Sequence, residues 1–219
     1  MSLPPAPGRP GMGIVCADIS TTVDGFGAGP GQCLERPFGD FDQGPLHAWM
    51  FDHGEENRAE VSAILDAGAY VMGRNMFSPG RGDWDLAWRG WWGEEPPYRA
   101  PVFVLTHHPR APLEMDGGTT FHFVTDGIES ALARAREAAG ERNVSIAGGA
   151  STVNAYLAAG LLDELRHHVT PNTSGLAASA GGSRLFEGVP AIGLVPVSVR
   201  HTPHVTHLTY SAGGHRQNG

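Results

Sequence analysis

The sequence predicts an α/β fold, in which helices flank a mixed β-sheet that closes with an antiparallel pair of strands. Short apolar runs alternate with helical patterns through the first two thirds of the chain, as in folds built on parallel strands. Near the end, apolar residues alternate along two neighbouring segments, which is typical of a β-hairpin. These residues are Val195, Val197 and Val199, and then, less strictly, Val205, Leu208 and Tyr210.

Composition and charge bound the class of protein. The chain has 219 residues, of which 41% are hydrophobic and 17% charged, an ordinary globular composition. The net charge is −8 and no basic run occurs, which argues against nucleic-acid binding. All 15 basic residues are arginine, which excludes Schiff-base chemistry on a lysine. With two cysteines, no apolar leader and no membrane-length apolar run, we expect a cytoplasmic protein without membrane contacts.

In the first half of the chain we expect two strands, two helices and two long loops. A strand at 13–20 runs into a glycine-studded loop at 24–31, which we interpret as a mobile flap. Helices follow at 45–53 and 55–68, then a short buried strand at 69–72. Residues 79–99 form a long connection that carries four tryptophans.

The second half repeats the alternation. Strands are predicted at 101–105 and 120–124, and a helix begins near Ile128. The strand that ends at Gly148 and Gly149 leads into a helix that reaches Gly160. A strand at 162–169 and a small-residue loop at 171–183 precede the hairpin. Without a repeat or a clear linker, we predict one domain over 12–211 with flexible ends at 1–11 and 212–219.

The glycine pair Gly148-Gly149 marks a candidate anion site. It separates an apolar strand from a helix that begins with Ser151 and Thr152. Such a turn aims free backbone N–H groups outward, at the positive end of the helix dipole, and suits a phosphate or pyrophosphate. The alternative is a plain strand-to-helix turn that uses glycine for its shape alone.

Two further strand ends carry polar tips, and together the three favour a dinucleotide site. The tips are Gly73-Arg74-Asn75, Thr106-His107-His108 and Gly148-Gly149-Ala150. Ligands of parallel sheets bind beyond the carboxyl ends of strands. Arginine can hold a phosphate through two parallel hydrogen bonds. The loop 24–31 does not match the G-x-G-x-x-G pattern of other dinucleotide sites.

These stretches, in this order, resemble the dihydrofolate-reductase-like family, and most closely its RibD C-terminal (riboflavin-biosynthesis reductase) branch. The resemblance runs over residues 13–210. The matching segments are Ser20–Gly25, Val71–Phe77, Val102–His107, Ile146–Ala150, Ala159–Leu165 and Arg184–Phe186.

The resemblance implies a mixed sheet of about eight strands and NADPH as the hydride donor. Arg74 would face the 2′-phosphate or the pyrophosphate, with Thr106 and His107 beside the adenosine. Asp24 would lie at the nicotinamide and substrate end, in a catalytic or substrate-binding role. The implied cofactor contacts are Gly73, Arg74, Asn75, Met76, Thr106, His107, Gly148, Gly149, Ala150, Ser151 and Thr152, and the further substrate contacts are Trp49, Phe51 and Trp91.

Each of these roles has a simpler alternative. Asp24 precedes a glycine, as in an ordinary turn, and Arg74 could form a surface salt bridge. Trp49 and Phe51 could be core residues, and Trp91 a loop anchor. A metal site is not predicted, because the spacing of His201, His204 and His207 alternates faces on an extended chain.

The resulting functional prediction is an NADPH-dependent reductase that transfers a hydride to a small heterocyclic or carbonyl/imine substrate, pterin- or aminopyrimidine-like. Relatives imply a homodimer. Two departures from the family keep an alternative open, a non-catalytic nucleotide-binding or assembly protein on the same fold. The loop 172–183 is polar and long, and no residue matches the helix carboxylate of dihydrofolate reductases.

Overall fold

The computed structural model describes residues 13–177 and 180–213. The predicted end at 1–11 lies outside them, as does most of the end at 212–219. No helix within the described residues is long and apolar enough to span a membrane. The elements are β1 (Val15–Thr22), β2 (Phe26–Ala28), α1 (Gly44–Phe51), α2 (Arg58–Leu65), β3 (Ala69–Gly73), α3 (Arg74–Phe77), β4 (Pro101–Leu105), β5 (Leu113–Glu114), the 3-10 turn η1 (Asp116–Gly118), β6 (Thr120–Val124), α4 (Ile128–Ala139), β7 (Val144–Ile146), α5 (Ala150–Ala158), β8 (Glu164–Thr170), β9 (Ser183–Arg184), β10 (Val195–Thr202) and β11 (Val205–Ser211).

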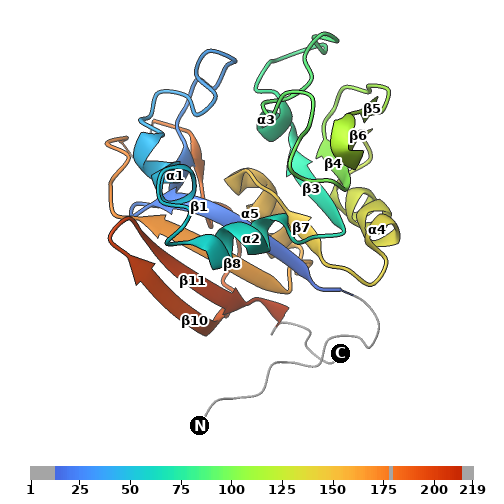
Figure 1. The fold of residues 1–219 in the computed structure, drawn as a ribbon. Helices are drawn as coiled ribbons and strands as arrows, with labels where there is room; N and C mark the ends of the chain where they lie inside the picture. The colour runs from blue at the N-terminus through green and yellow to red at the C-terminus, as the bar shows by residue number, and fades with distance from the viewer. Residues whose placement is uncertain (1–12, 178–179, 214–219) are drawn as a thin grey trace.

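The main sheet confirms the predicted mixed α/β architecture and has nine strands, in the order β10-β11-β8-β1-β7-β3-β4-β6-β5 (Figure 1). The strands from β8 to β6 run parallel. The predicted hairpin β10–β11 lies antiparallel at one edge, and β5 lies antiparallel at the other. The two-residue β5 is too short to show a period in the sequence.

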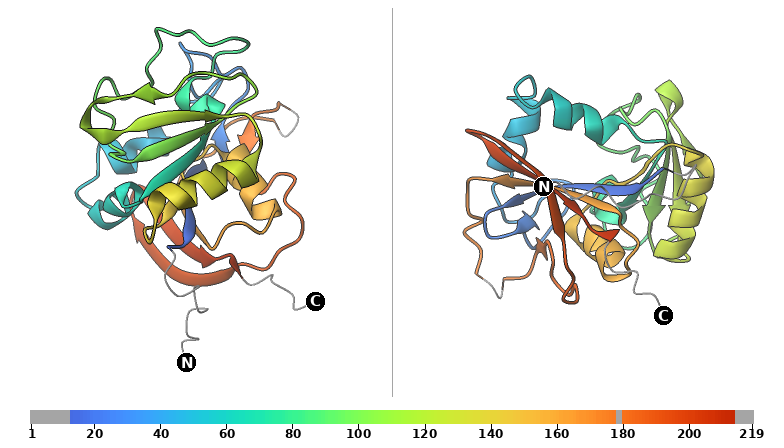
Figure 2. Two further views of the ribbon diagram at one scale, coloured as in Figure 1. Left: turned by 90° about the vertical axis from the view of Figure 1, so that its right-hand side faces the viewer. Right: turned by 90° about the horizontal axis from the view of Figure 1, so that it is seen from below.

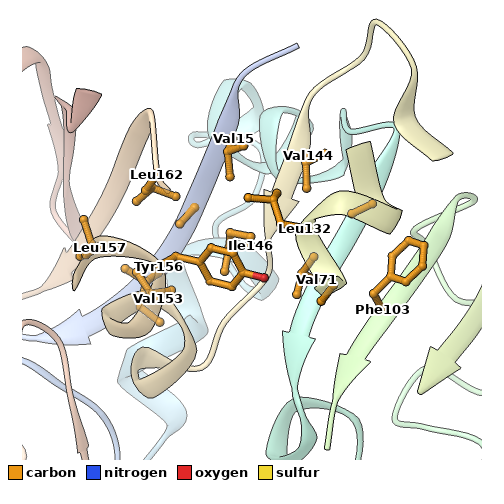
Figure 3. Packing of buried hydrophobic residues seen from close by; sticks show 14 of the residues in the cluster. Val15, Val71, Phe103, Leu132, Val144, Ile146, Val153, Tyr156, Leu157 and Leu162 are labelled. Atoms are coloured by element: carbon orange, nitrogen blue, oxygen red, sulfur yellow. The ribbon is translucent and has the colours of Figure 1, made fainter. Parts of the chain in front are cut away.

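Helices cover both faces of the sheet (Figure 2). On one face, α4 and α5 enclose the larger core with β1, β3, β4 and β7 (Figure 3). Ile146 of β7 and Tyr156 of α5 are fully buried there, and the Tyr156 hydroxyl donates to the Ile128 carbonyl at 2.8 Å. On the other face, α1 and α2 lie over β1 and β8, and the 79–99 segment covers a second core beneath β3, β4 and β6.

The loop interpreted as a mobile flap contains a strand, so this interpretation is wrong for part of it. Phe26 of β2 pairs with Arg184 of β9, and the two form a separate two-stranded sheet. β9 lies at the end of the predicted loop 171–183. Strands of two or three residues depend on a partner distant in the sequence, here about 160 residues away, so local pattern does not reveal them.

Candidate functional site

The three polar strand tips lie side by side at the carboxyl edge of the sheet. β3 lies between β7 and β4, and Gly73 is in register with Leu105 at the end of β4. The Gly73 N–H donates to the Gly148 carbonyl at 2.9 Å, and the Ala147 N–H to Val71 at 2.8 Å. The tips that begin at Gly73, Thr106 and Gly148 therefore form one continuous edge, as a shared ligand would require.

Space is open directly in front of α5. Gly149 precedes the first turn of this helix, and a Cβ added to Gly149 would meet no atom within 4 Å. Gly148 has a φ of +100°, which favours glycine, and the Gly148–Gly149 peptide bond is cis. The nearest atoms to an added Gly148 Cβ are the Met76 sulfur at 3.7 Å and Ile19 Cδ1 at 3.8 Å. The tip thus lies between β1 and α3.

The far side of the same helix start is closed by chain from β2 and β9. The Ser151 N–H donates to Ser183 Oγ at 3.3 Å, and the two hydroxyls lie 3.1 Å apart. A Cβ at Gly27 would lie 3.7 Å from Ala150 Cβ. Ser183 satisfies one of the helix's free N–H groups in place of a local cap, and sequence reasoning did not identify it because it lies 32 residues away.

Arg74 is a cation that packs against an aromatic ring. Its guanidinium stacks over the Trp84 ring at 4.1 Å, and its Nε is buried without a hydrogen-bond partner. Among the described residues it forms no ion pair, and neither do its neighbours Arg81 and Arg110. Burial, and then repulsion from Arg81, lowers the pKa of Arg74. The surface salt bridge weighed for Arg74 is therefore not formed.

Asn75 links the two sides of this edge. Its Nδ2 donates to Gln32 Oε1 at 2.8 Å, and its Oδ1 accepts from Arg81 at 2.8 Å. Gln32 belongs to the loop that follows β2, whereas Arg81 belongs to the long connection after α3. Neither residue was predicted for the site, because only the fold brings these two loops together.

The tip of β4 presents its residues in different directions. Thr106 Oγ1 accepts from the His108 N–H at 3.1 Å, and the His108 ring faces Asp83 with Nδ1 and Oδ1 3.6 Å apart. His107 is exposed. The two histidines thus face different surroundings, as expected for neighbours on extended chain.

Asp24 is engaged by the loop after β8. Its carboxylate accepts from the Ser174 N–H at 2.9 Å and from Ser174 Oγ at 2.6 Å. Burial alone would raise the pKa of Asp24, but the hydrogen bonds from Ser174 outweigh it and lower the pKa to about 2. Asp24 is therefore ionised at neutral pH and has no proton to donate.

The three predicted aromatic substrate contacts differ in exposure. Trp49 is fully buried, and its indole N–H donates to Ser20 Oγ at 3.1 Å, so it lies in the core. Phe51 is 61% exposed, and its ring centroid lies 6.2 Å from that of Trp92. Trp91 is 38% exposed and packs against Trp88, and it lines a small apolar cavity of about 10 Å³ with Met72 and Met76.

The tryptophans at 84 and 88 anchor the long connection. The Trp84 indole N–H donates to the His108 carbonyl at 2.8 Å, and that of Trp88 donates to the Phe77 carbonyl at 2.7 Å. The connection is therefore fixed to α3 and to the end of β4. Within the described residues, no group of three histidine, cysteine or acidic side chains is placed to bind a metal ion.

Together, these features define an α/β protein whose parallel strands end in a glycine-rich, cation-bearing edge suited to a phosphorylated ligand. The model of the RibD C-terminal domain matches residues 14–208. The chain belongs to this family.

Solved structures share the fold at low sequence identity. A protein named for riboflavin biosynthesis from Shewanella sp. PV-4 aligns over 90% of this chain and 98% of its own, with 21% identity and a TM-score of 0.62. The diaminohydroxyphosphoribosylaminopyrimidine deaminase/5-amino-6-(5-phosphoribosylamino)uracil reductase of Thermotoga maritima aligns over 91% of this chain and 56% of its own, with 15% identity and a TM-score of 0.56. A pyrimidine reductase-like protein of Corynebacterium diphtheriae aligns over 91% of this chain and 91% of its own, with 14% identity and a TM-score of 0.52. The chain thus spans just over half of the Thermotoga protein. No curated protein matches in sequence.

Proposed function

We propose that this protein is an NADPH-dependent reductase that transfers a hydride to a small heterocyclic or carbonyl/imine substrate, pterin- or aminopyrimidine-like. Membership of the RibD C-terminal family supports the reaction class. The observation that carries the cofactor proposal is the shared edge, where Arg74 begins α3 directly after β3, next to the open Gly148-Gly149 tip, and forms no ion pair within the described residues.

The residues present fit such a cofactor. The helix start after Gly149 and the hydroxyl of Thr152 would hold the pyrophosphate, joined by the hydroxyl of Ser151, which would exchange its contact with Ser183 for the phosphate. Arg74 would bind the 2′-phosphate, with Thr106 and His107 near the adenosine. Gly73, Asn75 and Met76 would line the dinucleotide. When bound, NADPH supplies the hydride.

The chain's own residues would then orient the substrate and exclude water. Phe51 of α1 and Trp92 of the long connection have ring centroids 6.2 Å apart and would together cover the substrate, with Trp91 as a further contact. Ionised Asp24 would accept a hydrogen bond from a substrate amino group rather than donate a proton. Proton delivery is therefore assigned to water.

The decisive experiment compares NADPH with NADH in binding to wild type and Arg74→Ala. A charged hydrogen bond contributes about 1.5–3 kcal/mol, so the NADPH Kd should rise about 10- to 100-fold. The NADH Kd should change less than about threefold, since NADH lacks the 2′-phosphate. Equal losses of affinity for NADPH and NADH would show that Arg74 does not bind the 2′-phosphate. If calorimetry detects no NADPH binding to wild type, the proposal is overturned.

One observation in the structure favours the alternative of a non-catalytic nucleotide-binding protein. Both carboxylate oxygens of Asp24 are already bonded to Ser174, so the predicted polar substrate contact is occupied within the chain. NADPH binding without turnover of pterins, flavins, quinones and aminopyrimidine ribosides would favour this alternative.

We also propose a homodimer formed through the edge strand β10. All but the last of its residues are exposed, and Val195, Val197 and Val199 are 52%, 62% and 65% exposed. An unpaired apolar edge invites another strand, and a second copy offers the same edge, so that antiparallel pairing about a two-fold axis would cover both.

A matched pair of variants tests this interface by light scattering after gel filtration. Val197→Lys should turn a dimeric wild type into a monomer. Val23→Lys, at a residue of equal 62% exposure in the turn after β1, should leave the mass unchanged. A monomeric wild type, or a Val197→Lys dimer as stable as wild type, would contradict the proposal.

A further inference from the structure

A chain of polar side chains lies buried between the sheet and the helices α1 and α2. Asp18 of β1 faces His168 of β8, with Oδ1 and Nε2 3.4 Å apart. His168 Nδ1 lies 2.8 Å from Nδ1 of His207 on β11. His207 Nε2 lies 3.0 Å from Oδ1 of Asn57, which precedes α2. The four residues are nearly inaccessible to water.

The orientation of Asn57 fixes one end of this chain. Its Nδ2 donates to the carbonyls of Trp49 and His53, both at 2.9 Å. Its Oδ1 accepts from Arg200 at 3.0 Å. The amide oxygen therefore faces His207, and because an amide oxygen only accepts, His207 Nε2 must carry the hydrogen.

If both histidines are neutral, these four side chains have one hydrogen too few to bond every neighbouring pair. Burial, and then the neighbouring His168, lower the pKa of His207, and His207 faces an amide where His168 faces a carboxylate, so His207 takes the neutral form. With its hydrogen on Nε2, its Nδ1 accepts, and His168 Nδ1 must donate to it. A neutral His168 would then turn the lone pair of Nε2 toward the Asp18 carboxylate, two acceptors face to face.

An additional proton resolves this conflict. We propose that His168 carries a proton on each ring nitrogen, as a buried imidazolium that donates to Asp18 on one side and to His207 on the other. Without this proton, Asp18 Oδ1 and His168 Nε2 are both buried and both lack a hydrogen-bond partner within the described residues. An imidazolium makes this contact a charge-assisted hydrogen bond.

The surrounding charges favour the proton on His168 rather than on Asp18. Arg166 NH1 lies 3.3 Å from Asp18 Oδ2, which stabilises the ionised carboxylate. Glu164 pairs with the other side of Arg166 at 2.7 Å, and Glu60 of α2 pairs with Arg200 beyond Asn57. Burial raises the pKa of the neighbouring Cys16 to about 12, so the thiol stays neutral.

The charge on His168 affects the packing of α1, because His168 lies against Trp49 of that helix. This side chain is fully buried, and its ring centroid lies 4.7 Å from that of His168 and 5.0 Å from that of His207. An imidazolium against an indole face gains cation–π attraction that a neutral ring lacks. α1 also carries Phe51, so His168 is a positioning residue for that side of the candidate site.

The test is ¹⁵N NMR of the histidine rings in the full chain, with Asp18→Asn and Glu164→Gln as matched variants. At pH 7.5 an unperturbed imidazole is about nine-tenths neutral, whereas His168 should show two protonated nitrogens. In Asp18→Asn the amide that replaces the carboxylate can itself donate to His168 Nε2, so this variant should give a neutral His168. Glu164→Gln also removes a carboxylate from Arg166 but does not touch His168, and should retain the imidazolium.

A second readout follows the indole N–H resonance of Trp49 as the pH is raised. It should shift when His168 loses its second proton in wild type and Glu164→Gln, and stay unchanged over that range in Asp18→Asn. A neutral His168 in wild type at pH 7.5 would overturn the proposal without any variant. A doubly protonated His168 in Asp18→Asn would also overturn it, since the proton would then not depend on Asp18.

Discussion

Asn57 offers a sharp test of the packing that supports α1, because its side chain is fully buried and makes four hydrogen bonds. Asn57→Ala removes them all. Arg200 is exposed and keeps Glu60 as a partner, so water can replace one bond. Of the other three partners, Trp49 and His207 are buried and His53 is partly buried. At about 1 kcal/mol each, we expect the free energy of unfolding to fall by about 3 kcal/mol.

Urea unfolding followed by circular dichroism measures this loss, as a shift in the midpoint of about 1 M. Asn57→Asp keeps the shape of the side chain but cannot donate to Trp49 or His53, and should cost about 2 kcal/mol. The control is Asn172→Ala, which removes one bond from Thr170 at a half-buried position and should cost less than about 1 kcal/mol. An Asn57→Ala midpoint equal to that of Asn172→Ala would refute the reasoning.

Two further variants probe the loops around the site. Ser174→Ala removes the hydroxyl bond that lowers the pKa of Asp24 and keeps the backbone N–H bond, so a ¹³C titration should move that pKa from about 2 part of the way up toward its ordinary 3.8. A carboxylate whose pKa is lowered by folding stabilises the fold at pH values above its unfolded pKa, and this stabilisation is lost as the pH falls toward the folded pKa. The stability of Ser174→Ala should therefore fall less than that of wild type between about pH 4 and pH 2. An unchanged Asp24 titration in the variant would contradict the role given to Ser174. Gly149→Ala places a methyl group where no atom lies within 4 Å, at a φ of −72° that alanine adopts. We expect its melting temperature to stay within about 2 °C of wild type while NADPH binding weakens, and unchanged NADPH affinity would move the pyrophosphate elsewhere.

The fold was largely predictable from the sequence, because its elements have strong local patterns. The parallel strands are short apolar runs, and the hairpin alternates along β10 and β11. The strand tips at Gly73, Thr106 and Gly148 followed from where those runs stop. The short elements escaped prediction: the strands β2, β5 and β9 exist only through their partners, and the helix α3 has only 4 residues.

The candidate site was predictable only in part, for the same reason. Arg74 and the glycine pair could be identified from residue type and position at strand ends. The contacts that Ser174, Ser183 and Arg81 make depend on loops that meet only after folding. Trp49 was a candidate substrate contact through the family resemblance, but its side chain is fully buried, as in the alternative of a core residue.

The sequence by itself determined the α/β class, the order of the strands along the chain and the residues at their ends, since propensity and periodicity act over a few neighbours. Tertiary structure decided which strand ends became neighbours, by inserting β7 between β1 and β3. It also placed Asp18, His168, His207 and Asn57 in one buried chain. These contacts join residues up to 150 positions apart, and packing in three dimensions, rather than local pattern, determines which of them meet.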